Sequence, residues 1–230
     1  MKKLILIISV ILATPALVFA HQLRIVKEEI TKVQNPEISQ AFYGKLAGHP
    51  QYFEINSDKK FSLYVGILVP DIKGIKTNIS AEVIQVKEEG REVIDVLDGT
   101  TFLWSRFYEP FAGDNYFKGP EFSTEAQPGK YLIHIFSFCH PEPPVGGEGS
   151  QCQSYQGKYA LVIGQQESFS LGETWRTLQL LPALKKDFFG KSPLTMFFNY
   201  IGLGLVAVLL ILAVIIFLLA KVVKKIIIHN

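Results

Sequence analysis

Apolar side chains occupy every second position of the stretch Phe61-Ser-Leu-Tyr-Val-Gly-Ile-Leu-Val69. Successive side chains of a β-strand point to opposite faces, so these apolar side chains share one face. We therefore predict that residues 61–69 form a strand with one face in a hydrophobic core.

Similar short runs, separated by turn residues, lie on both sides of this strand, whereas helical periodicity is absent before residue 170. This pattern is typical of an all-β fold, and we predict an antiparallel β-sandwich of jelly-roll or Ig-like topology. The other predicted strands are 23–26, 41–46, 52–55, 79–86, 92–97, 130–138 and 158–163.

Two apolar segments near the ends of the chain predict its topology. Residues 1–20 combine a basic start, an apolar run and a final Val18-Phe-Ala20, as in a bacterial signal peptide. Residues 201–220 contain no charged side chain and are long enough to cross the ~30 Å core of a bilayer. We predict an extracytoplasmic domain over residues 21–168, a single span over 193–220 that starts at Ser192-Pro193, and a short cytoplasmic tail over 221–230 of a cell-membrane protein.

Residues 169–192 predict a juxtamembrane amphipathic helix. Ser170 and Glu173 have the spacing of a capping box, and Pro182 should kink the helix. The helix could lie in either of two places, at the membrane surface or on the sandwich. Residues such as Trp175 and Lys185 suit a headgroup boundary, but the apolar face could equally pack against the sandwich. That face carries Trp175, Leu178, Leu181, Leu184 and Phe188.

The formal net charge of +2 does not describe the exported domain. Five of the 23 basic residues lie near the termini, while all 21 acidic residues lie between them, so residues 21–195 carry 18 basic and 21 acidic residues, a net charge of −3. No basic stripe is present. We therefore expect no nucleic-acid partner.

Several short motifs carry a resemblance to a known family. They are Gly44-Lys-Leu-Ala-Gly48, then Gln51-Tyr-Phe-Glu-Ile55, and two Gly-Lys-Tyr strand starts at Gly129 and Gly157. Their order resembles that of bacterial pre-peptidase C-terminal and related jelly-roll or carbohydrate-binding-like sandwiches. Such modules are non-catalytic, so the resemblance implies a binding or presentation role. In both Gly-Lys-Tyr segments we expect a buried tyrosine ring whose hydroxyl reaches the backbone.

Residues 102–122 form a segment rich in aromatic residues, which we expect to be an inserted loop. Its rings could form an exposed platform that stacks on a sugar, with Trp104, Tyr108 and Tyr116 as ligand-binding residues. Packing of these rings over the sandwich is the alternative. Asp114 and Asn115 also offer oxygen ligands for Ca²⁺, although an Asx turn explains them without a metal.

The two cysteines, Cys139 and Cys152, lie in the predicted exported domain, where we expect them to form a disulfide. A copper site is a further hypothesis. Cleavage after Ala20 would make His21 the N-terminus, and its amine and imidazole could chelate copper together with a second imidazole. The candidates for that imidazole are His49, His134 and His140.

No nucleophile elbow, phosphate loop or paired zinc histidines occur in the sequence. We therefore expect a binding or presentation protein at the cell surface, with the lipid bilayer and a surface glycan or protein as partners, no enzyme activity and no cofactor. Copper binding through His21 (as a carrier or in redox chemistry) and carbohydrate binding through residues 102–122 are the alternative functions.

Overall fold

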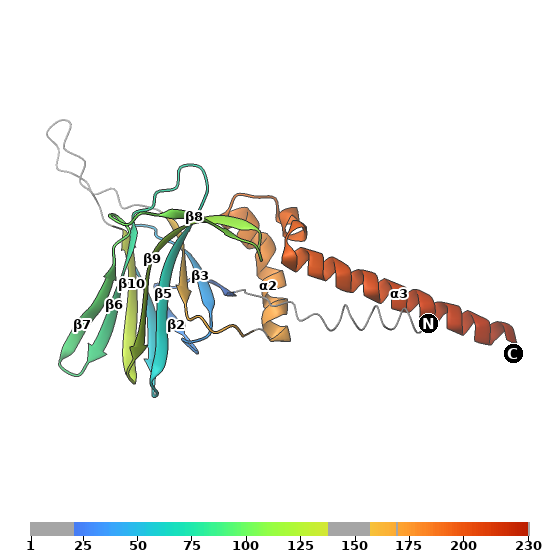
Figure 1. Ribbon diagram of the computed structural model, residues 1–230, viewed down its shortest axis with the longest axis horizontal. Helices are drawn as coiled ribbons and strands as arrows, with labels where there is room; N and C mark the ends of the chain where they lie inside the picture. Colours follow the sequence, from blue (N-terminus) through green and yellow to red (C-terminus); the bar gives the residue numbers. More distant parts are fainter. Residues whose placement is uncertain (1–20, 138–156, 169, 230) are drawn as a thin grey trace.

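The structure is a computed structural model of the 230-residue chain and describes residues 21–137, 157–168 and 170–229. These residues form a sandwich of two β-sheets, followed by helical segments that lead into a long terminal helix (Figure 1). The predicted signal peptide and the cysteine pair lie outside the described residues.

One sheet, here called sheet A, has the strand order β1-β3-β11-β5-β9-β8, and sheet B has the order β2-β4-β10-β6-β7. Each strand predicted from alternation has a counterpart among them, whereas β2, β8 and β9 were not predicted. The bounds are β1 (Gln22–Ile25), β2 (Ile30–Val33), β3 (Gln40–Lys45), β4 (Gln51–Ser57), β5 (Phe61–Pro70), β6 (Ile79–Lys87), β7 (Gly90–Leu97), β8 (Ser105–Glu109), β9 (Asp114–Ala126), β10 (Gly129–Ser137) and β11 (Lys158–Ile163).

The hydrophobic core lies between the sheets. Leu63, Val65, Ile67 and Val69 of β5 are completely buried, which confirms the face predicted from their alternation. Tyr131 is buried in the same core, and its hydroxyl donates to the carbonyl oxygen of Gln127 at 2.9 Å, as the first Gly-Lys-Tyr segment predicts. The hydroxyl of Tyr159 instead donates to the Gln51 side chain, at 2.5 Å.

The prediction of a purely antiparallel sandwich was wrong for two strand pairs. β1 pairs with β3 in parallel, and β2 pairs with β4 in parallel, while the other pairs are antiparallel. The chain alternates between the sheets over its first four strands. Neighbours within a sheet are therefore not joined by a hairpin here, and nothing forces them to run in opposite directions.

Residues 102–122 were predicted to be a loop, but most of them form β8 and the first part of β9. The pairing of β5 with β9 shifts between Gly66 and Leu68, where Gly119 and Pro120 on β9 oppose Ile67 alone. This β-bulge changes which positions face the core, so Phe117 lies inward before it and Phe122 lies inward after it. The inward-facing positions of β9 are odd-numbered before the bulge and even-numbered after it, so its sequence does not show strict alternation.

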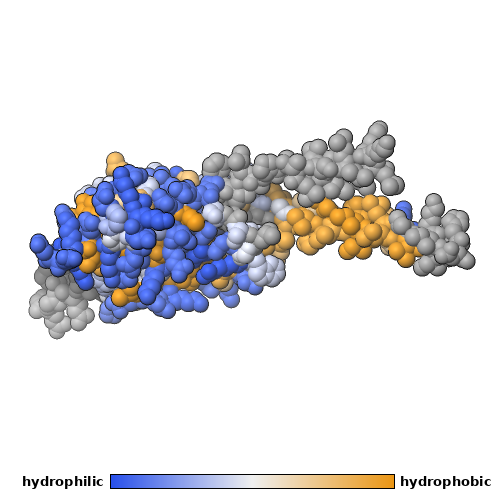
Figure 2. Space-filling model, turned by 90° about the horizontal axis from the view of Figure 1, so that it is seen from below, coloured by the Kyte–Doolittle hydropathy of each residue, from blue (hydrophilic) through white to orange (hydrophobic). Residues whose placement is uncertain are grey.

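The helical elements follow the last strand. They are α2 (Leu171–Ala183), the π-helical turn η1 (Leu184–Phe188), the 3₁₀ helix η2 (Pro193–Phe198) and α3 (Tyr200–His229). The predicted span start at Ser192-Pro193 is the start of η2, and the long helix begins at Tyr200. The candidate span within α3 covers residues 202–221 and has a mean hydropathy of 3.4, and its most apolar part is not buried. This apolar helix projects from the sandwich (Figure 2) and is consistent with a single membrane span.

Candidate functional site

The juxtamembrane segment, which we define as residues 170–199, covers part of the outer face of sheet A. Its buried residues Leu181, Leu184 and Phe188 form a second apolar cluster with Leu23 and Tyr116 of the sandwich. The apolar face of the predicted amphipathic helix therefore packs on the sandwich. Trp175, at the start of the same predicted face, is 64% exposed.

Local sequence explains where α2 begins and where it changes form. The Ser170 hydroxyl accepts a hydrogen bond from the Glu173 backbone N–H at 3.2 Å, which confirms the predicted cap. The Glu173 carboxylate also accepts from both Arg24 guanidinium nitrogens, at 2.7 and 3.1 Å. Pro182 has no N–H to donate within the helix, and the π-helical turn η1 begins two residues later.

A buried ionic cluster joins the juxtamembrane segment to the β8–β9 turn. Lys185 is completely buried, and its Nζ lies 2.6 Å from Oδ2 of Asp114, which is also completely buried. Lys191 donates to the other oxygen of Asp114 at 2.8 Å, and Lys185 donates a further hydrogen bond to the Ala112 carbonyl. Burial lowers the pKa of Lys185, while Asp114 opposes that shift. Of the two positions left open for this segment, the one on the sandwich agrees with the burial of Lys185, because a carboxylate distant in sequence binds it inside the protein.

Asn199 links the sandwich to the first turn of α3. Its side-chain amide donates to the Ala112 carbonyl at 2.7 Å, and its side-chain oxygen accepts from the Gly202 N–H at 2.9 Å. The side chain thus caps α3 while it is bonded to the β8–β9 turn. The start of the apolar helix is consequently held at a defined place on the sandwich.

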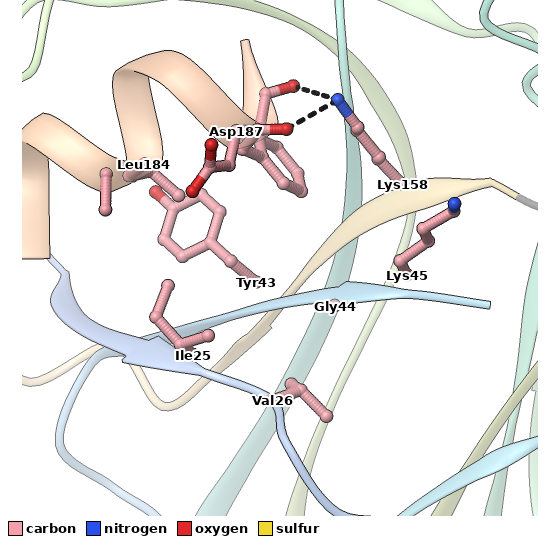
Figure 3. A pocket seen from close by; sticks show the side chains of 10 residues that line it. Ile25, Val26, Tyr43, Gly44, Lys45, Lys158, Leu184 and Asp187 are labelled. Atoms are coloured by element: carbon pink, nitrogen blue, oxygen red, sulfur yellow. Dashed lines mark hydrogen bonds between the residues drawn. The ribbon is translucent and has the colours of Figure 1, made fainter. Parts of the chain in front are cut away.

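A hollow of about 250 Å³ lies between the juxtamembrane segment and the strands β1 and β3 (Figure 3). Its wall is mainly apolar, from Ile25, Val26, Tyr43, Leu184 and Phe188. We call it the lysine groove. Its charged lining residues are Lys45, Lys158 and Asp187.

Two lysines face each other across the strands at this groove. Lys45 of β3 and Lys158 of β11 are direct partners in the antiparallel register. Lys158 donates to the carbonyl oxygens of Asp187 and Phe188, at 2.8 and 2.9 Å, as Figure 3 shows. Among the described residues, neither lysine has a carboxylate within 4.0 Å. Burial lowers the pKa of Lys158, and the charge of Lys45 lowers it further. Like charges directly opposite each other destabilise a sheet. The two carbonyl bonds offset this cost for Lys158, whereas the Lys45 side chain has no such partner among the described residues.

Sequence reasoning did not single out these lysines. Each of them directly follows a glycine in one of the motifs that carried the family resemblance, Gly44-Lys45 and Gly157-Lys158. Only the strand register brings the two motifs together.

A second hollow of about 510 Å³ lies between β1, β2 and the start of α2. Its main polar groups are already bonded to one another. Arg24 donates to Glu173 and to the side chain of Gln22, while the Gln40 amide donates to the Gln34 carbonyl at 2.8 Å. These contacts hold the first strands to α2, and we do not assign this hollow a ligand.

The structure places the described candidate copper ligands at separate positions. His21 lies under the juxtamembrane segment and is hydrogen bonded to the Ser39 hydroxyl, while burial lowers its pKa. His134 lies in sheet B, beside Glu82 at 3.0 Å and stacked on Tyr52, and it alternates along β10 with inward-facing residues. His49 is exposed between β3 and β4, and His140 lies outside the described residues. The described part of the chain contains no group of three or more His, Cys, Asp or Glu side chains that could hold a metal ion.

The candidate aromatic ligands do not form one platform. Trp104 packs against the core, its indole N–H donates to the Gly99 carbonyl at 2.8 Å, and its ring rests on Gly119, where a Cβ would lie only 2.5 Å from it. Tyr116 is 1% exposed and lies beneath the juxtamembrane segment. Of the three predicted rings only Tyr108 is largely exposed, at 55%.

Asp114 and Asn115, the candidate calcium ligands, point to different environments. Both carboxylate oxygens of Asp114 accept hydrogen bonds from lysines, whereas Asn115 is exposed on β9. The positive charge that a calcium ion would supply is therefore provided by Lys185 and Lys191. The predicted disulfide between Cys139 and Cys152 lies outside the described residues.

Comparison with known proteins gives structural matches but no sequence matches. No family model matches the chain, and no curated protein matches it. Among solved structures, the pre-peptidase C-terminal domain of a collagenase from Bacillus anthracis matches at 13% sequence identity and a TM-score of 0.33, with 59% of this chain and 95% of that domain covered. That domain bears the name of the family whose motif order this sequence resembles.

Proposed function

We propose that this chain is a membrane-anchored binding protein, with its β-sandwich on the outer side of the membrane and its C-terminus in the cytoplasm. In this proposal it binds or presents a ligand or a protein partner and does not catalyse a reaction. The observation that carries the proposal is the joint between the sandwich and the apolar helix, formed by Lys185, Asp114, Lys191 and Asn199. A flexible linker would suffice to retain a domain at a membrane. A buried ionic joint also sets the orientation of the domain.

Exposed apolar side chains next to the joint support a bilayer surface at this level of the molecule. Leu194 and Phe198 of η2 are 65% and 84% exposed, and Tyr200 at the start of α3 is 62% exposed. Tyrosine is among the residues enriched where a span enters the headgroup region. The lysine groove lies on the same covered face of sheet A, and we propose it as the binding site.

Membrane residence is tested by carbonate extraction of the full chain, expressed in a bacterial host. The chain should stay with the membrane fraction, because about 20 apolar residues of α3 would lie in the bilayer. The double substitution Leu210→Arg/Val214→Arg should release it, since each arginine at a span centre costs about 2.5 to 3.5 kcal/mol on insertion scales. A wild-type chain recovered in the soluble fraction would contradict the proposal.

Orientation is tested with two C-terminal fusions of the full chain. Green fluorescent protein should fluoresce when it is fused after Asn230, because that end is expected in the cytoplasm. Alkaline phosphatase at the same place should be inactive, because it folds only after export. The reverse pair of results would place the sandwich in the cytoplasm.

A further inference from the structure

We propose that the lysine groove binds an amphiphilic anion, that is, a molecule with a carboxylate or phosphate head and a short apolar chain. This inference rests on the proposed binding function and names the ligand class of the groove. The Lys45–Lys158 register pair carries it, because a bound anion would offset the like charge of the two lysines.

The charges around the groove are complementary to an anionic head. The Lys45 side chain has no hydrogen-bond or salt-bridge partner among the described residues, and the Lys158 ammonium group is bonded to two neutral carbonyl groups. Asp187 is the acidic residue in the lining, so the lining carries a net positive charge. Both lysines come from strand ends, and the strand register keeps them together.

The rest of the groove is suited to an apolar chain. Tyr43 and Phe188 meet edge to face with ring centroids 5.1 Å apart, and they form a rigid wall beside Leu184. Ile25 of β1 is 38% exposed and lines the open side. An apolar chain lying on these side chains would remove them from water, whereas a simple anion such as phosphate would leave them exposed.

The ligand class is tested by calorimetric titration of the full chain in phosphatidylcholine nanodiscs, with empty nanodiscs as blanks. The probes are butyl phosphate, hexyl phosphate and inorganic phosphate. Saturable 1:1 binding of hexyl phosphate is expected, and each buried methylene should raise the affinity about four-fold. An affinity that does not depend on chain length, or no saturable binding, would overturn the proposal.

The lysines are tested with the double substitution Lys45→Gln/Lys158→Gln. We expect at least a ten-fold loss of hexyl phosphate affinity. The thermal midpoint should change little, because removal of the like-charge pair is offset by loss of the two carbonyl hydrogen bonds of Lys158. The matched control, Lys59→Gln/Lys73→Gln, removes two exposed lysines away from the groove and should bind as the wild type does. Equal binding by the two double variants would refute the role of Lys45 and Lys158.

Two sources of such a ligand are distinguished by repeating the titration in nanodiscs that contain phosphatidylglycerol. A weaker apparent affinity for hexyl phosphate would show that a bilayer lipid occupies the groove, and an unchanged affinity would identify a free amphiphile as the ligand. Loss of binding in a chain that still resists carbonate extraction would reject this ligand class and leave the membrane-anchored function standing.

Discussion

Lys185 shows how the energetics of one side chain depend on a distant partner. An isolated buried ammonium group is very costly, and the cost is offset here by Asp114 at 2.6 Å and by the Ala112 carbonyl. Such a pair contributes little net stability compared with apolar residues of the same size. Loss of one partner is nevertheless severe, because the other charge then remains buried alone.

Asp114→Ala should therefore destabilise the chain by about 3 to 5 kcal/mol, since Lys185 loses its counter-charge. Denaturant unfolding of the micelle-bound chain measures the loss. Asp58→Ala, which removes an exposed carboxylate, serves as the control and should change stability by less than about 0.5 kcal/mol. The variant Asp114→Leu/Lys185→Met should recover most of the loss, and a double variant as unstable as Asp114→Ala would argue against this account.

The buried imidazole of His21 should make the stability of the chain depend on pH. Burial lowers its native pKa below the unfolded value of about 6.5, so the unfolded chain binds more protons in that window. Stability should therefore fall as the pH drops from about 6.5 towards the native pKa. His21→Gln should flatten this part of the curve, measured as thermal midpoint against pH. His49→Gln, at an exposed site, should leave it unchanged, and a similar effect of both substitutions would contradict the assignment.

The elements around residues 102–122 show why a dense aromatic segment need not be a binding surface. The bulge at Gly119-Pro120 leaves space for the ring of Trp104, which fixes the chain that leads into β8. Any side chain larger than that of glycine at position 119 would collide with this ring. The aromatic residues thus complete sheet A rather than extend it with a free loop.

Trp104→Ala should lower the free energy of unfolding by about 3 kcal/mol. This value is near the lower limit for such truncations because the ring is only half-buried. Trp175→Ala is the matched control. Trp175 is 64% exposed, so its removal should change stability by less than about 0.5 kcal/mol. Thermal unfolding of both variants checks the difference. Equal and small losses would mean that Trp104 is not part of the packed structure.

At the scale of the whole molecule, the β8–β9 turn is the point where the sandwich, the juxtamembrane segment and the apolar helix meet. The Ala112 carbonyl accepts hydrogen bonds from both Lys185 and Asn199, so one backbone group is bonded to η1 and to the cap of α3. A ligand that moves η1 at the lysine groove would act on the same joint.

Asn199→Ala should loosen this joint without unfolding the sandwich. Removal of a capping side chain costs about 1 kcal/mol, which corresponds to roughly five-fold faster amide exchange at Gly202. Hydrogen exchange of the micelle-bound chain, followed by mass spectrometry, measures the rate. Asn115→Ala, on the exposed side of β9, is the control and should leave the exchange of this region unchanged.

Much of this architecture follows from short-range patterns in the sequence. Alternation along Phe61–Pro70 predicts a buried strand because strand geometry assigns each side chain to a face without reference to any partner. The Ser170 cap and the apolar run of α3 are predictable for the same reason, since both depend on residues within one or a few helical turns. The short strand β2 escapes detection because three of its four residues are not buried.

The tertiary structure alone decided the features on which the proposed function depends. Strand register brought Lys45 opposite Lys158, and packing brought Lys185 to Asp114, 71 positions away in sequence. The same packing buried Tyr116 and Trp104 and separated His21 from His134. Hydrophobic periodicity shows that a surface will be covered, but it carries no information about which segment covers it. Pairing between distant residues is set by the packing of the whole chain, and a local pattern of side chains cannot encode it.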